Sequence, residues 1–156
     1  MKSSGFTLVE LVIVLVVVGI LSVTAMGLFA SRADFSASLA KDQFIASLLT
    51  AQQRALAHHS SSPVLFTVLQ SADGSDWILT VSQGTESFTE KTIERAGAVL
   101  QIGGVTLADG GNRVVSFSGS GETLEGSDLT WRFTGESTHQ FCLGEAGFAY
   151  SGACVP

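Results

Sequence analysis

The sequence predicts an α+β fold in which one long N-terminal helix packs on antiparallel β-structure. Residues 6–30 are almost entirely apolar, and the residues after them are amphipathic with a helical period. After Pro63 the apolar residues alternate with a period of two, which is typical of strands. Seventeen glycines and only two prolines indicate many tight turns in the β-rich part.

The N-terminal segment is long and apolar enough to serve as a membrane anchor. Between residues 6 and 30 the polar side chains are Thr7, Glu10, Ser22 and Thr24. About 20 apolar residues cross the hydrocarbon core of a bilayer as a helix. An ordinary secretory signal has a shorter apolar core followed by a small residue at the cleavage site, whereas Gly5 precedes this run. A carboxylate inside a membrane span is costly, so Glu10 is expected to have a partner and a role.

The run from Gly5 to Leu11, Gly-Phe-Thr-Leu-Val-Glu-Leu, resembles the type III signal of type IV pilins and type II secretion pseudopilins. That family has a glycine, then Phe-Thr-Leu-[Ile/Val]-Glu-Leu, then a long apolar helix. The resemblance implies that prepilin peptidase cuts between Gly5 and Phe6 and methylates the new amino group of Phe6. It implies a prepilin leader over 1–5, a transmembrane and polymerisation helix over 6–30, and a pilin globular domain over 31–156.

Glu10 has a physical role in this scheme. After cleavage, the α-amine of Phe6 lies one helical turn from Glu10 and is positively charged near neutral pH. Within a filament, Glu10 of one subunit can meet the amine of the next. A buried ion pair is weak evidence for stability but can specify register. We therefore expect Glu10 to act in assembly.

The helix is expected to continue beyond the apolar segment to about residue 59, its second half packing on the domain. The apolar face is predicted from residues spaced mainly by three and four: Phe35, Leu39, Ile45, Leu48, Leu49, Gln52, Ala55 and Leu56. The β-rich part is expected over 63–156, beginning with a hairpin turn at 71–76. Strands are predicted over 64–69, 77–81, 87–93, 98–102, 113–117, 129–133, 140–143 and 148–150.

The layout narrows the resemblance. The helix end at 51–57, followed by a strand at Val64, is similar to the GspH/FimT group of minor pilins and minor pseudopilins. The two cysteines near the C-terminus are similar to those in minor pilins of the mannose-sensitive haemagglutinin (MSHA) pilus, the MshC type. The resemblance implies a non-catalytic minor pilin, single-pass in the inner membrane with its domain in the periplasm, which is assembled into a pilus.

The implied partners are prepilin peptidase, the inner-membrane assembly platform, and other major and minor pilin subunits that contact the N-terminal helix. The nearest alternative is a minor pseudopilin of type II secretion. A DNA-uptake pilin is less favoured, because the residues beyond 30 include seven basic and thirteen acidic ones and phosphate contacts require clustered bases. An anchored periplasmic enzyme is the remaining alternative.

Cys142 and Cys154 are the only cysteines, and a domain outside the cytoplasm is expected to oxidise them to a disulfide. No C-x-x-C redox pair is present, and a metal site would need more ligands nearby. The adjacent His58 and His59 point about 100° apart on a helix, which makes them a poor chelating pair. We therefore expect neither a metal nor a cofactor.

Other residues that could perform chemistry have simpler interpretations. The serines at 60–62 are expected to form a turn, since no G-x-S-x-G motif is present. The glycine-rich segment 119–121 lacks the lysine of a phosphate-binding loop. Trp77, Trp131 and Tyr150 could form a binding surface, but aromatic residues in strands are more often part of the core. The sequence therefore predicts that the protein is not an enzyme.

Overall fold

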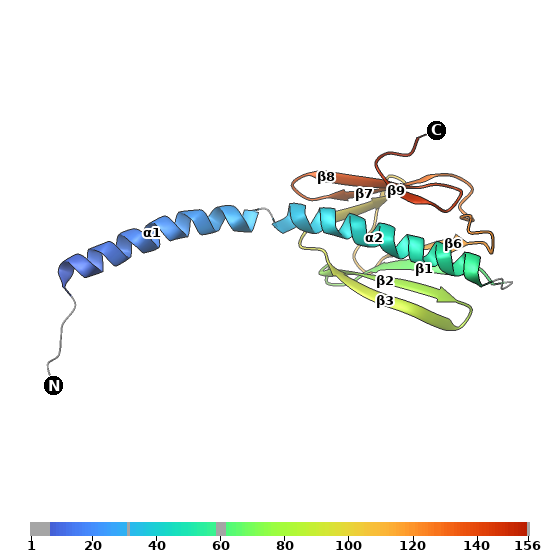
Figure 1. Cartoon of the computed structure of the whole chain (residues 1–156), viewed down its shortest axis with the longest axis horizontal. Helices are drawn as coiled ribbons and strands as arrows, with labels where there is room; N and C mark the ends of the chain where they lie inside the picture. Colours follow the sequence, from blue (N-terminus) through green and yellow to red (C-terminus); the bar gives the residue numbers. More distant parts are fainter. Residues whose placement is uncertain (1–6, 31, 59–61, 156) are drawn as a thin grey trace. The chain divides into compact units, whose positions relative to one another are not determined.

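The computed structural model describes residues 7–30, 32–58 and 62–155. The chain divides into two compact units, Met1–Arg32 and Ala33–Pro156. The predicted α+β fold is confirmed. Two helices, α1 (Leu8–Ala30) and α2 (Arg32–Ala57), precede a series of antiparallel strands (Figure 1). The predicted helix boundaries at Phe6 and His59, like Ser31 between α1 and α2, lie outside the described residues.

The strands form two antiparallel sheets. The first sheet has the order β3-β2-β1-β6 and contains β1 (Val64–Gln70), β2 (Asp76–Gln83), β3 (Glu86–Glu94) and β6 (Asn112–Phe117). The second sheet has the order β5-β4-β7-β8-β9 and contains β4 (Val99–Ile102), β5 (Val105–Thr106), β7 (Leu129–Thr134), β8 (Thr138–Leu143) and β9 (Ala149–Ser151). In Figure 1 the two sheets lie on either side of α2.

Eight strands agree with the sequence prediction to within two residues at each end, and the hairpin between β1 and β2 is present. Strands such as β1 and β2 alternate buried side chains with more accessible ones, and this alternation is the signal that the sequence carries. The ninth strand, β5, was not predicted. It contains only Val105 and Thr106, both exposed, which is too short for a periodic pattern.

Helix α2 packs across both sheets through Phe44, whose side chain is fully buried. The ring centroid of Phe44 lies 5.8 Å from that of Trp77 in the first sheet and 5.0 Å from that of Phe133 in the second. Edge-on packing of this kind is favourable beyond the area it buries. The core of the domain is therefore a cluster of aromatic rings between one helix and two sheets.

The buried face of α2 agrees with the prediction only in part: Leu48 and Ala55 are buried as expected. It consists of residues spaced by three and four, with alanine at four of the six positions: Ala37, Ala40, Phe44, Leu48, Ala51 and Ala55. Phe35, Leu39 and Leu56 were expected on this face but are exposed by 71%, 45% and 49%. The prediction gave weight to large apolar residues. The sheets already supply the aromatic rings, so small side chains on the helix allow it to approach closely.

Candidate processing and assembly site

The start of α1 is held by a reciprocal pair of side chains, Thr7 and Glu10. One carboxylate oxygen of Glu10 accepts hydrogen bonds from the backbone N–H and the hydroxyl of Thr7, each 3.0 Å long. The backbone N–H of Glu10 in turn donates to the Thr7 hydroxyl over 3.2 Å. This arrangement is a capping box, which satisfies backbone donors that the first turn of a helix leaves unpaired. Glu10 therefore has a local partner at the helix terminus.

The body of α1 exposes apolar side chains in every direction. From Leu8 to Ser22 each described residue is exposed, including Leu8 at 78% and Leu15 at 63%. Glu10 and Ser22 are the polar residues of this range, and the Ser22 hydroxyl donates to the carbonyl of Val18 over 2.7 Å. An apolar surface of this extent on a soluble protein marks a site that another molecule covers.

The predicted cleavage residues Gly5 and Phe6 lie outside the described residues. Over the part of the chain that the structure describes, no helix meets the combined length and apolarity needed to cross a membrane. The described part of the predicted signal, from Thr7 to Leu11, contains the capping pair of Thr7 and Glu10.

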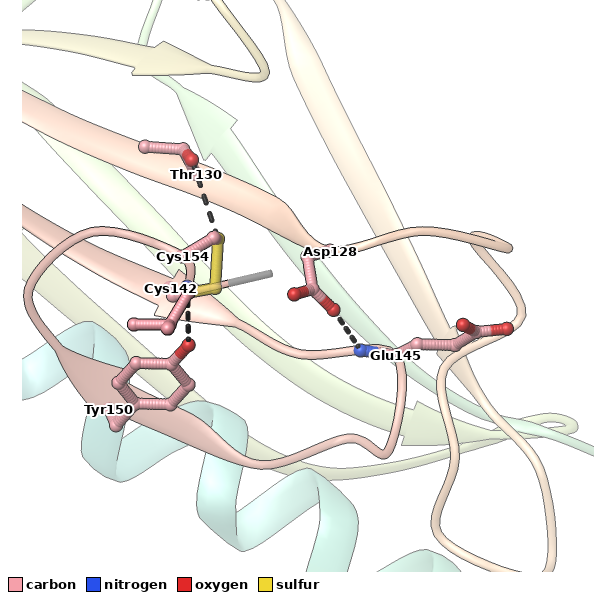
Figure 2. Close-up of a disulfide and its surroundings, with 7 residues drawn as sticks. Asp128, Thr130, Cys142, Glu145, Tyr150 and Cys154 are labelled. Atoms are coloured by element: carbon pink, nitrogen blue, oxygen red, sulfur yellow. Dashed lines mark hydrogen bonds between the residues drawn. A yellow bond between two sulfur atoms is a disulfide. The ribbon is translucent and has the colours of Figure 1, made fainter.

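The predicted disulfide between Cys142 and Cys154 is present, with the two Cα atoms 4.9 Å apart (Figure 2). It ties the C-terminal segment to β8. Two further contacts hold this segment: the hydroxyl of Thr130 lies 3.4 Å from the sulfur of Cys154, and the backbone N–H of Val155 donates to the Tyr150 hydroxyl over 3.3 Å. The C-terminal segment is thus joined to three neighbouring strands of the second sheet, β7, β8 and β9.

Asp128 lies beside the disulfide, and one of its carboxylate oxygens and both sulfurs lie within 4.8 Å of one another. The sulfurs are bonded to each other, and metal binding requires the thiolate form. Asp128 has a structural role, since its carboxylate accepts a 2.8 Å hydrogen bond from the backbone N–H of Glu145. Asp128 therefore supports the turn after β8.

Of the remaining candidates from the sequence, Trp77 and Trp131 both pack against Phe44. Trp77 and Trp131 are fully buried in the core, as expected, and Tyr150 is partly exposed. His58 follows the last residue of α2, and its ring lies 3.3 Å from the guanidinium of Arg54. The other described histidine, His139, contacts the hydroxyl of Ser137. His59, Ser60 and Ser61 lie outside the described residues.

Comparison with known families bears on the N-terminal segment. Residues 1–26 match the prokaryotic N-terminal methylation motif. This match supports a type IV pilin-like or pseudopilin subunit. Such a motif implies processing by prepilin peptidase, a membrane anchor and a structural role in pilin assembly. Searches among curated proteins and among solved structures found no match.

The sequence interpretation missed Thr7 as part of the site. The signal was available, because Thr-x-x-Glu immediately before an apolar run is the pattern of a capping box. The prediction assigned Glu10 to the amine of Phe6, and the structure adds that the same carboxylate binds Thr7.

Proposed function

We propose that this chain is a non-catalytic minor pilin that is cut between Gly5 and Phe6, methylated at Phe6 and assembled into a type IV pilus. The observation that carries the proposal is the methylation motif over residues 1–26, with Glu10 at the start of an exposed apolar helix. Prepilin peptidase, the inner-membrane assembly platform and other major and minor pilin subunits are the proposed partners. Residues 1–5 form the leader, and residues 31–156 form the globular domain.

In this proposal the apolar segment serves two environments in turn. The sequence from 6 to 30 first anchors the subunit in the inner membrane as a single pass, with the domain in the periplasm. In the filament, the same side chains pack against the helices of neighbouring subunits. The described side chains of α1 are exposed on the isolated chain, which is what a segment requires if it is covered only by lipid or by other subunits.

Glu10 sets the register of assembly in this proposal. A charged amine of a neighbouring Phe6 would bring a positive group to a carboxylate that otherwise lies among apolar side chains. The hydrogen bonds from Thr7 hold the carboxylate at the helix terminus before the neighbour arrives. Only one oxygen of Glu10 accepts these bonds, so the other oxygen can accept from the amine.

The C-terminal disulfide supports the proposed location and subtype. Disulfides persist in oxidising compartments such as the periplasm. Together with the helix end before Val64, the Cys142–Cys154 pair favours a GspH/FimT-type subunit similar to the MshC type of the MSHA pilus. The minor pseudopilin of type II secretion has the same N-terminal signal and is the alternative to be separated by experiment.

The test is co-purification of the tagged chain with filaments. The full chain is expressed in its own host, the pili are sheared from the cells, and the chain is measured in the pilus fraction. Gly5→Val serves as the control, because a branched side chain obstructs the peptidase and the uncut chain stays in the membrane. Presence in sheared pili supports the proposal. Presence only where a secretion pseudopilus is assembled favours the alternative, and absence from both contradicts it.

A further inference from the structure

The two edge strands of the first sheet, β6 and β3, differ in how their outer edges are covered. The outer edge of β6 is covered at its end by the loop that follows it: Leu124 N–H donates to the carbonyl of Ser116 over 2.9 Å, and Phe117 and Thr123 form an antiparallel bridge. The edge strand β3 pairs with β2 alone, and no strand among the described residues pairs with its other side. Figure 1 shows β3 at the outer margin of the domain. An uncovered edge is a template for pairing with another chain.

Strand β3 is long and regular enough to accept such a chain. It has nine residues, more than any other described strand, and most of its side chains are exposed. From Thr89 to Glu94 its register with β2 is uninterrupted, and the irregularity of the ladder lies at the other end, between Val81 and Ser82 of β2. At the last residue of β3, the Ser36 hydroxyl of α2 donates to the carbonyl of Glu94 over 3.0 Å, which leaves one lone pair of that carbonyl for a partner.

Charged side chains alternate along this regular part of β3. Ile93 is buried against the core, so the odd-numbered residues from Thr89 to Ile93 point toward α2. Glu90, Thr92 and Glu94 therefore point to the opposite, outer face of the sheet. The outer face carries two carboxylates four residues apart, Glu90 and Glu94, whereas Lys91, which lies between them in the sequence, is on the opposite face.

This pattern opposes pairing with a second copy of the same chain. In an antiparallel pair, residues directly opposite each other lie on the same face, and like charges there are destabilising. A self-pair centred on Glu90 places Glu90 opposite Glu90, and one centred on Lys91 places Lys91 opposite Lys91. A self-pair centred on Thr92 places Glu90 opposite Glu94 twice. Each central register thus opposes like charges.

We propose that β3 binds an extended segment of a different protein by antiparallel strand addition, and that its charges select the sequence of that segment. The complementary partner has basic residues opposite Glu94 and Glu90 and an acidic residue opposite Lys91. It has an apolar residue beside Ile93 and a β-branched residue opposite Thr92. Read in its own direction, the segment is basic, apolar, β-branched, acidic, basic.

The proposal is tested with two synthetic peptides and the full chain in detergent micelles. The first peptide has the core Lys-Val-Thr-Glu-Lys, and the control peptide has the reversed charges, Glu-Val-Thr-Lys-Glu. We expect saturable binding of the first peptide with an affinity on the order of tenfold higher than that of the control, since three opposite-charge pairs replace three like-charge pairs. Equal affinities would contradict the proposal, as would no binding of either peptide.

Charge reversal on the protein supplies a second test. The triple variant Glu90→Lys, Lys91→Glu, Glu94→Lys should prefer the control peptide. Glu136→Lys, which changes one charge in the exposed turn between β7 and β8, should leave the preference of the wild-type chain unchanged. Hydrogen exchange should show new protection of β3 amides in the presence of the first peptide. Protection elsewhere but not in β3, or a dimer of the wild-type chain cross-linked through β3, would overturn the proposal.

Discussion

The carboxylate of Glu10 accepts two hydrogen bonds from Thr7, one from its backbone N–H and one from its hydroxyl, each 3.0 Å long. This contact makes the acid of the N-terminal signal part of the helix terminus. In the proposed assembly the same acid meets the amine of a neighbouring Phe6. Capping requires hydrogen-bond acceptors, whereas attraction to an amine requires a negative charge, so the two roles can be separated by substitution.

We expect Glu10→Gln to be cleaved and inserted like the wild-type chain but to enter filaments at a reduced level. Glutamine can replace glutamate in a capping box, so the helix terminus is preserved while the charge is lost. Glu10→Val, which removes both roles, should show the same loss of assembly with normal cleavage. The measurement is the amount of chain in sheared filaments relative to the amount in membranes.

Thr7→Ala is the matched control for these variants. It removes the threonine hydroxyl from the cap at a cost of about 1 kcal/mol of helix stability, but it keeps the carboxylate. It should therefore assemble better than Glu10→Gln. If Glu10→Gln assembles at the wild-type level and Thr7→Ala does not, Glu10 acts by capping, and its proposed pairing with the amine is wrong.

Removal of the disulfide should destabilise the domain without abolishing any catalytic activity. The Cys142–Cys154 bond closes a loop with a sequence separation of 12. In the chain-entropy model such a loop contributes about 3 kcal/mol to the free energy of unfolding. We expect the double Cys→Ser variant to lose roughly that amount in denaturant unfolding. Two free thiols in non-reducing peptide mapping of the wild-type chain would contradict the assignment.

Gly147 should tolerate alanine far less well than Gly104. Both glycines have positive φ, 83° and 81°, so alanine carries a similar backbone strain at either position. A Cβ at Gly104 would meet open space, whereas a Cβ at Gly147 would overlap the backbone carbonyl oxygen of Gly121. We expect Gly147→Ala to lower the free energy of unfolding by at least about 1–3 kcal/mol more than Gly104→Ala does. Equal losses of stability in the two variants would show that the loops containing Gly121 and Gly147 can move apart at little cost.

The turn between β1 and β2 should lose stability in acid. Hydrogen bonds from the side chain of Ser71, and then from the backbone and side chain of Ser75, lower the pKa of Asp73 from 3.8 to about 2. A lowered pKa means that the folded state favours the ionised form, so this contribution is complete above about pH 4 and is lost as the pH falls through about 2. Asp73→Asn should be less stable than the wild-type chain at neutral pH. The difference should shrink as the pH falls from about 4 through about 2 and disappear below that, and a difference that does not change with pH would contradict this role.

The strands could be predicted from the sequence because each half-buried strand repeats its pattern over two residues. The pairing of those strands into two sheets could not, because contacts such as Val64 with Phe117 depend on residues far apart in the chain. The buried face of α2 was predicted only in part, at Leu48 and Ala55, because alanine carries little hydrophobic signal. Its burial at Ala37 and Ala51 depends on aromatic rings that the sheets supply.

The candidate site could be predicted in part from the sequence. Its signal is local: Gly5, Phe6 and Glu10 lie within six residues, and the methylation motif spans residues 1–26. The capping partner Thr7 is local too and was available from the spacing alone. The open edge at β3 could not be inferred from the sequence, because it depends on which strands pair and on which edge the loop after β6 covers.

The central claim is that the chain is processed at the end of its leader, and the most direct test is the N-terminus of the mature protein. The chain is purified from sheared filaments and its N-terminal peptide is measured by mass spectrometry. We expect the peptide to begin at Phe6 with one methyl group on its α-amine, and Gly5→Val to accumulate uncut in the membrane fraction. An intact Met1 on filament-associated chain would contradict the claim.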